Sequence, residues 1–321
     1  MLAVYADSAN PTDPLAALVV GERPEPEPRS GWQRVEVKAA SLNHHDIWSL
    51  RGVGLPSDRL PMILGCDAAG IDESGREVVV HGIINDPDWT GSETQDPKRS
   101  LLSEKFQGTF AKYVLVPERN LIPKPAELSF VQAAALPTSW LTAYSALVSK
   151  SGLKPGDTVL IQGAGGGVST ALTVLAHAMG FRVWVTTRDL SKRERSIALG
   201  ADEVFESGAR LPQRVDAVME TVGQATWAHS VRALRPGGTI VISGATSGDA
   251  PPAELTRIFF LELKVIGSTM GSKSELESML KFMVDHKIEP VIDQVLPMSN
   301  AGEGFARMLA GDVFGKIVFT L

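Results

Sequence analysis

A glycine cluster in the middle of the chain has the residue types and spacing of a phosphate-binding turn. It comprises Gly163, Ala164, Gly165, Gly166, Gly167 and Val168. Glycines let a backbone turn tightly and approach a diphosphate, whose charge is met by the amides and dipole of a following helix. Ser169 stands where a third glycine is usual, and its small hydroxyl still permits close packing of a helix on a strand. Taken alone, such a cluster fits a purely structural turn equally well.

The residues about 20 positions further on bear on the choice of cofactor. Enzymes that use NAD place an acidic residue there to bind the ribose hydroxyls. This chain has Thr186, Thr187 and Arg188, with Lys192 one helical turn beyond. A 2′-phosphate would be repelled by a carboxylate but bound by Thr187, Arg188 and Lys192. NADP(H) is therefore favoured, although Asp189 leaves NAD as an alternative cofactor. If Arg188 and Lys192 are only solvated surface charges, the cofactor preference stays undetermined.

The segments around the glycine cluster alternate between short apolar runs and helical stretches. Strands are predicted over residues 158–161, 182–186, 216–219 and 239–242, with an edge strand over 263–267. They lack alternation, as expected for strands buried on both faces. Helices are predicted over 169–179 and 191–199, each followed by a glycine. This order predicts a parallel, doubly wound α/β sheet that places the glycine cluster after a strand and before a helix.

The chain on either side of this sheet has a different pattern. Up to about Ser139 it carries short alternating runs bounded by turn residues, which predict antiparallel strands of a barrel-like or sandwich-like domain. The polar stretch 85–98 reads as a long surface loop. From about Gly271, helices are predicted over 274–286 and 301–310 and strands over 291–296 and 316–321. The pattern alone does not assign this last zone to a domain.

Composition excludes several classes of function. The 321 residues suffice for two domains, and the net charge of −6, without a basic cluster, argues against a nucleic-acid partner. No apolar run approaches the roughly 20 residues needed to span a bilayer, and the first residues lack the layout of a secretory signal. The single cysteine, Cys66, excludes an intrachain disulfide and a cysteine-rich zinc site. A cytoplasmic protein without a membrane partner is expected.

Many short motifs in a fixed order resemble the medium-chain dehydrogenase/reductases, specifically their zinc-free, quinone-oxidoreductase-like branch. They lie at 40–46, 61–70, 108–113, 141–144, 163–169, 198–202, 234–238 and 315–318. The resemblance implies an α/β fold in which a GroES-like, mainly-β catalytic domain (1–139 and 271–321) accompanies a Rossmann dinucleotide-binding domain (140–270). It also implies a homodimer that pairs edge strands near residues 263–268. Zinc-containing relatives act on alcohols, whereas zinc-free relatives reduce quinones or activated double bonds with NADPH.

The resemblance also predicts that no metal is bound. Asn43, Cys66 and Thr138 match the positions at which relatives ligate catalytic zinc, and Asn and Thr are poor zinc ligands. The segment that carries four cysteines in relatives with structural zinc has none here. An improvised site of His44, His45, Cys66 and Asp67 is a weaker reading, because ligand type alone does not make a tetrahedral geometry. Cys66 is expected to be a small buried residue.

The matched motifs carry over candidate site residues. Asn43 is expected to face the nicotinamide and donate its amide to substrate or cofactor, His45 to deliver a proton, and Asp46 to orient one of them or to be structural. A structural or solvated role for the histidines, with water as the proton source, stays open. Trp48 fits a substrate pocket or a packed core equally well. Further cofactor contacts are expected from Thr138, Thr142, Gly244, Ala245 and, through a phosphate, Lys316.

The leading functional hypothesis is an NADPH-dependent reductase that transfers hydride to a quinone or an α,β-unsaturated carbonyl without catalytic zinc. Two alternatives remain: a zinc-dependent alcohol or polyol dehydrogenase, and a non-catalytic NADPH-binding scaffold or sensor. The sequence does not identify the substrate.

Overall fold

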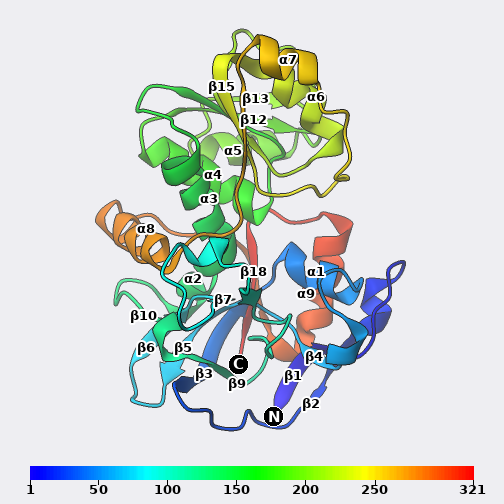
Figure 1. Ribbon diagram of the computed structural model, residues 1–321, viewed down its shortest axis with the longest axis vertical. Coiled ribbons are helices and arrows are strands. Elements are labelled where there is room, and N and C mark those ends of the chain that lie inside the picture. Colours follow the sequence, from blue (N-terminus) through cyan, green and yellow to red (C-terminus); the bar gives the residue numbers. More distant parts are fainter. The chain divides into compact units, whose positions relative to one another are not determined.

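The chain forms two compact units in the computed structural model, which describes all residues from Met1 to Leu321 (Figure 1). The first unit contains Met1–Ser139 and Ser272–Leu321, and the second contains Trp140–Gly271. The end of the chain therefore belongs to the first unit, a placement that the sequence pattern leaves open.

The main sheet of the first unit is built around the long strand β3 (Trp32–Ser41). The strand order is β10-β6-β5-β3-β18-β17, and β9 also pairs with β3. The red terminal strand β18 thus lies beside a blue strand from the start of the chain (Figure 1). The register sets Ser41 opposite both Asp67 and Val318. The other strands of this sheet are β5 (Asp67–Asp72), β6 (Glu77–Val80), β9 (Tyr113–Pro117), β10 (Leu121–Pro123), β17 (Ile292–Pro297) and β18 (Lys316–Thr320).

Smaller elements complete the first unit. Strands β1 (Leu2–Ala6), β2 (Leu18–Glu22) and β4 (Met62–Ile63) form a second sheet, and β7 (Ile83–Ile84) pairs with β8 (Ser100–Leu101). The antiparallel pairing predicted for residues before Ser139 is confirmed. In its core, Phe110 packs edge-to-face against Phe305 and Phe319, and all three rings are fully buried. The helices are α1 (His44–Leu50), α2 (Phe130–Ala134), α8 (Lys273–Asp285) and α9 (Ala301–Ala310), and short 3-10 turns lie at Pro14–Ala17, Ser57–Arg59, Glu93–Gln95, Glu118–Asn120 and Met298–Asn300.

The second unit contains the predicted parallel sheet, in the order β13-β12-β11-β14-β15-β16. The strands are β11 (Thr158–Ile161), β12 (Arg182–Thr187), β13 (Glu203–Glu206), β14 (Val215–Glu220), β15 (Leu234–Ile242) and β16 (Lys264–Gly267). Strand β16 lies at the edge, as predicted, whereas the outer strand β13 is missing from the sequence prediction because its charged ends mask its apolar centre. The helices are α3 (Leu141–Ser145), α4 (Gly167–Ala178), α5 (Lys192–Ala198), α6 (Gln224–Ala233) and α7 (Leu255–Phe260), with a π-helical turn at Ala146–Lys150. A second π-helical turn, Leu136–Trp140, begins in the first unit and ends at the first residue of the second.

The predicted surface loop at 85–98 is held by one buried carboxylate. Asp96 accepts hydrogen bonds from the amides of Asp86 (2.8 Å) and Lys98 (2.7 Å). The loop therefore keeps a defined shape with only one 3-10 turn inside it. Elsewhere, no helix combines the length and apolar character that crossing a bilayer requires.

Candidate active site

The glycine turn joins β11 to α4 and leaves the start of that helix open. Gly163 and Gly165 have φ angles of +82° and +98°, which residues with a side chain rarely adopt. Gly166 is the N-cap of α4, and no side chain caps the first-turn amides. These amides and the helix dipole form an anion-binding surface. Ser169 is buried and donates to the Gly166 carbonyl (3.0 Å), so it fits the close helix packing expected of it.

A buried polar network lies beneath this turn. Thr186 accepts a hydrogen bond from the Gly163 amide (3.2 Å) and donates to the side-chain oxygen of Gln162 (2.6 Å). The Gln162 amide nitrogen donates to Ser230 (2.9 Å), whose hydroxyl donates to the carboxylate of Glu220 (2.6 Å). The network joins the ends of β11, β12 and β14 to helix α6 and fixes the turn. Sequence analysis missed Gln162, Glu220 and Ser230, because separate segments show no shared spacing.

Glu220 also shapes the neighbouring loop after β14. One of its carboxylate oxygens accepts from the amides of Val222 (2.8 Å) and Gly223 (3.0 Å), and Thr226 donates to both oxygens. Since β11, β12, β14 and β15 are parallel, their carboxyl ends lie on one edge of the sheet. That edge brings the glycine turn together with Arg188 and with Gly244 and Ala245, which follow β15 and are half-buried.

The end of β12 offers cationic groups, but not every predicted one faces outward. Arg188 is exposed and Lys192 half-exposed at the start of α5. Thr187 is buried; its hydroxyl accepts from the Asp189 amide and donates to the Asp189 carbonyl, both at 3.0 Å. This arrangement argues against the expected phosphate contact of Thr187, because the hydroxyl is used within its own turn. The carboxylate of Asp189 accepts from the Ser191 hydroxyl and amide, which lower its pKa.

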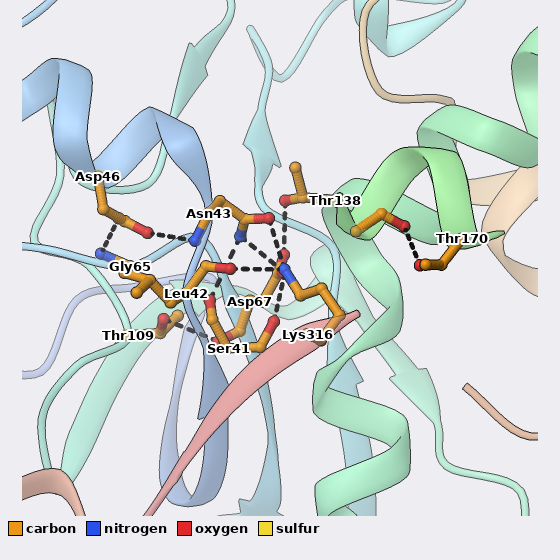
Figure 2. Close-up of polar contacts among 11 residues, drawn as sticks. Ser41, Leu42, Asn43, Asp46, Gly65, Asp67, Thr109, Thr138, Thr170 and Lys316 are labelled. Carbon is orange, nitrogen blue, oxygen red and sulfur yellow. Dashed lines mark hydrogen bonds and ion pairs between the residues drawn. The ribbon is translucent and has the colours of Figure 1, made fainter. Parts of the chain in front are cut away.

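Several predicted residues of the first unit, but not His45, lie around a buried lysine (Figure 2). The side chain of Lys316 is 2% exposed, and its Nζ donates to the Leu42 carbonyl (2.7 Å) and to Asn43 Oδ1 (2.7 Å). Asp67 Oδ2 lies 3.5 Å away as the counter-ion. Burial lowers the pKa of Lys316, while Asp67 and Asp46 oppose that change. Because three acceptors surround the ammonium, this enclosure argues against the expected phosphate contact of Lys316.

The carboxylate of Asp67 is saturated with donors. Its Oδ2 accepts from Ser41 (2.8 Å) and the Asn43 side-chain amide (2.8 Å), and its Oδ1 accepts from Thr138 (2.5 Å). Asn43 Nδ2 also lies 3.3 Å from the Ser41 carbonyl. Both hydrogens of the Asn43 amide therefore have acceptors inside the protein. The expectation that this amide donates to substrate or cofactor is not supported by the geometry, and Asn43 instead links Lys316 to Asp67.

Asp46 acts on the backbone around helix α1. Its carboxylate accepts from the backbone amides of Asn43 (2.9 Å) and Gly65 (2.9 Å). The first of these bonds is part of the capping box at the start of the helix. The side chain is fully buried, and this burial raises its pKa to about 6, opposed by His45 and by the two amides. Of the two roles expected for Asp46, the structural one accounts for these contacts.

The side chains of His45 and Cys66 are not hydrogen-bonded to Lys316, Asn43 or Asp67. His45 Nε2 has no hydrogen-bond partner and lies 3.9 Å from Glu104 Oε1, and both side chains are partly exposed. Glu104 was missed in the sequence because it comes from a distant loop. Cys66 is buried, as predicted, and donates to the Leu102 carbonyl (3.3 Å). Burial, reinforced by Asp46 and Asp67, raises the pKa of the Cys66 thiol well above its usual value.

The remaining predicted residues are distributed between the two units. Thr142 is buried in α3, and Trp48 is half-buried on α1, where the Arg51 guanidinium lies 5.4 Å from its ring centre. These contacts do not decide their roles, which stay predictions.

Comparison with known proteins connects this geometry to a family. The alcohol dehydrogenase GroES-like domain matches residues 29–126, and the zinc-binding dehydrogenase domain matches residues 167–285. A zinc-type alcohol dehydrogenase-like protein of Schizosaccharomyces pombe is 30% identical, with 89% of this chain and 90% of the relative covered. An acryloyl-coenzyme A reductase of Sulfurisphaera tokodaii is 28% identical, with coverage of 95% and 97%. A crystal structure titled as an NAD-dependent alcohol dehydrogenase is 36% identical, with a TM-score of 0.92 and full coverage of both chains.

The two folds and the glycine turn define a medium-chain dehydrogenase/reductase. Within that superfamily, the chain belongs to the zinc-type alcohol dehydrogenase-like family.

The family's description implies zinc, but the residues present do not fit that metal. Zinc sites use thiolate, imidazole or carboxylate ligands, usually three or four together. Asn43 and Thr138 supply none of these groups, which leaves the buried Cys66 as the single such ligand among the three matched positions. No three His, Cys, Asp or Glu side chains are arranged to hold a metal ion. Moreover, the Lys316 ammonium lies between Asn43 and Asp67.

We expect Asp46→Asn to remove a pH dependence of stability. Folded Asp46 holds its proton up to about pH 6, whereas the unfolded carboxyl releases it near 3.8. The folded state thus binds more protons between these values, so this residue's contribution to the free energy of unfolding falls as pH rises through the window. The change is about 3 kcal/mol for a shift of roughly two units. Urea unfolding of both proteins from pH 4 to 7 measures it; parallel curves would contradict the assignment.

Proposed function

We propose that the protein is an NADP(H)-dependent reductase that transfers a hydride to an α,β-unsaturated carbonyl or a quinone without catalytic zinc. The observation that carries the proposal is the uncapped N-terminus of α4 behind the glycine turn, on the same sheet edge as the exposed Arg188. This arrangement suits a diphosphate at the turn and a further phosphate at Arg188 and Lys192. The similarity to an acryloyl-coenzyme A reductase supports an activated double bond as substrate.

The first unit supplies the groups for the substrate's chemistry. Bound NADPH would supply the hydride, which adds to the β-carbon of the double bond while the electron pair moves to the carbonyl oxygen. A proton must then reach the α-carbon. The His45 side chain is partly exposed, while its Nε2 atom is itself buried and has no hydrogen-bond partner. His45 is our candidate proton donor, and the Glu104 carboxylate lies 3.9 Å from its Nε2.

Oxidation of NADPH by acceptor panels tests this function. We expect wild-type protein to oxidise NADPH with an enoyl thioester, an enone or a quinone, followed by absorbance of the reduced nicotinamide. His45→Gln should lower kcat about 100-fold, because general-acid catalysis is lost, while NADPH affinity stays unchanged. His44→Gln is the matched control, since it makes the same change at the neighbouring residue of α1. NADPH binding without turnover of any acceptor would instead favour the scaffold or sensor. Equal rates for wild type and His45→Gln would leave water as the proton source.

The preference for the phosphorylated cofactor depends on Arg188. We expect Arg188→Ala to weaken NADPH binding about tenfold and to leave NADH binding unchanged, because only NADPH carries the charge that the guanidinium binds. Isothermal titration calorimetry with both cofactors measures the difference. Arg193→Ala, an exposed arginine on α5, is the control and should change neither affinity. Equal losses for the two cofactors would exclude this basis for selectivity.

A homodimer is also part of the proposal, supported by the surface at the edge of the parallel sheet. Strand β16 ends the sheet with Val265 43% exposed, and on α7 Phe259 and Phe260 are 69% and 78% exposed. Unpaired edge backbone beside apolar side chains favours self-association. Sedimentation should give twice the chain mass of 34.3 kDa, and Phe260→Glu should shift it toward one chain. A wild-type monomer at micromolar concentration would contradict the dimer.

A further inference from the structure

The buried cluster around Lys316 carries an inference that rests on the metal-independent function proposed above and explains it. We propose that the Lys316 ammonium is the resident cation of this site. It takes the place of a divalent metal among the oxygens of Leu42, Asn43 and Asp67, and it keeps such a metal out.

The contacts of the ammonium are those of an enclosed cation. Two oxygens lie 2.7 Å from Nζ and a third lies at 3.5 Å, one for each hydrogen of the ammonium. One of them is a carboxylate, one an amide oxygen and one a backbone carbonyl, which are all groups that also bind hard divalent cations. The side chain is 2% exposed, and Asp67 is completely buried. A metal ion could therefore reach these oxygens only after Lys316 had left.

Charge balance favours the lysine over a metal beside it. The ammonium and the Asp67 carboxylate form a neutral pair, and a divalent cation added beside them would leave two uncompensated positive charges in a buried volume. The Asp67 carboxylate that completes this pair also accepts from Ser41 and Asn43 at Oδ2 and from Thr138 at Oδ1.

The cation also has a positioning role. Lys316 orients the side-chain oxygen of Asn43, whose nitrogen is thereby directed to Asp67. Asn43 is the N-cap of α1, the helix on which His45 is the second residue. The last strand of the chain thus fixes the start of the helix that carries the candidate proton donor.

Metal binding by variants tests the exclusion directly. Lys316→Ala removes the cation and keeps the three oxygens, so we expect it to gain one saturable Mn²⁺ site, titrated by electron paramagnetic resonance. Wild type should bind no Mn²⁺ and, after purification, carry zinc well below one ion per chain. Lys316→Ala with Asp67→Asn should lose the gained site. Stoichiometric metal in wild type, or no Mn²⁺ in a folded Lys316→Ala protein, would overturn the proposal. Circular dichroism and NADPH binding establish folding.

A double-mutant cycle covers the case in which Lys316→Ala does not fold. Lys316→Met and Asp67→Asn each leave one buried charge without its partner, and each should lower the Tm by about 10 °C. The double variant should recover more than half of the summed loss, because no charge is left unpaired. Strictly additive losses would show that the two groups are not coupled and would refute the resident cation. Neither readout uses turnover, so an absence of reductase activity would refute the proposed function and leave this result standing.

Discussion

The buried ion pair between Lys316 and Asp67 is a constraint that the fold of the first unit must satisfy. Lys316 begins β18, Asp67 begins β5, and the register of both strands against β3 brings them together at Ser41. Two charges in a low-dielectric interior are tolerated only when each is paired and hydrogen-bonded. The pair therefore requires Ser41, Asn43 and Thr138 as partners. This requirement connects the end of the chain to the start of helix α1.

The second unit solves a different electrostatic problem. Its glycine turn must leave amides available to an anion while the backbone keeps one shape. Hydrogen bonds among Gln162, Thr186, Ser230 and Glu220 satisfy the buried polar groups beneath the turn, and Thr186 holds the turn through the Gly163 amide. Helix α4 starts without a capping side chain. The turn requires positive φ angles at Gly163 and Gly165, which glycine adopts without strain.

The polar groups at the site of this protein differ from those that the family's description implies. The framework is that of zinc-type dehydrogenases, with an alcohol dehydrogenase GroES-like domain and a zinc-binding dehydrogenase domain. The polar residues on that framework form a cation–carboxylate cluster of nitrogen and oxygen groups instead of a thiolate and imidazole set. Because function depends on the groups at the site, the residues at this site, and not the family's description, decide whether zinc can bind.

The sequence by itself determined the parallel sheet, the glycine turn, the terminal helices and the burial of Cys66, because periodicity and glycine spacing are local properties of a chain. Through the family resemblance, it also indicated Asn43 and Asp46 as catalytic candidates and Lys316 as a contact for a cofactor phosphate. Only the tertiary structure decided which groups these residues contact. Lys316 and Asn43 are separated by 273 positions, and their contact depends on the pairing of β18 with β3. The same pairing turned an expected phosphate ligand into a buried counter-ion, because burial and partners, which set the role of a charge, are properties of the folded chain.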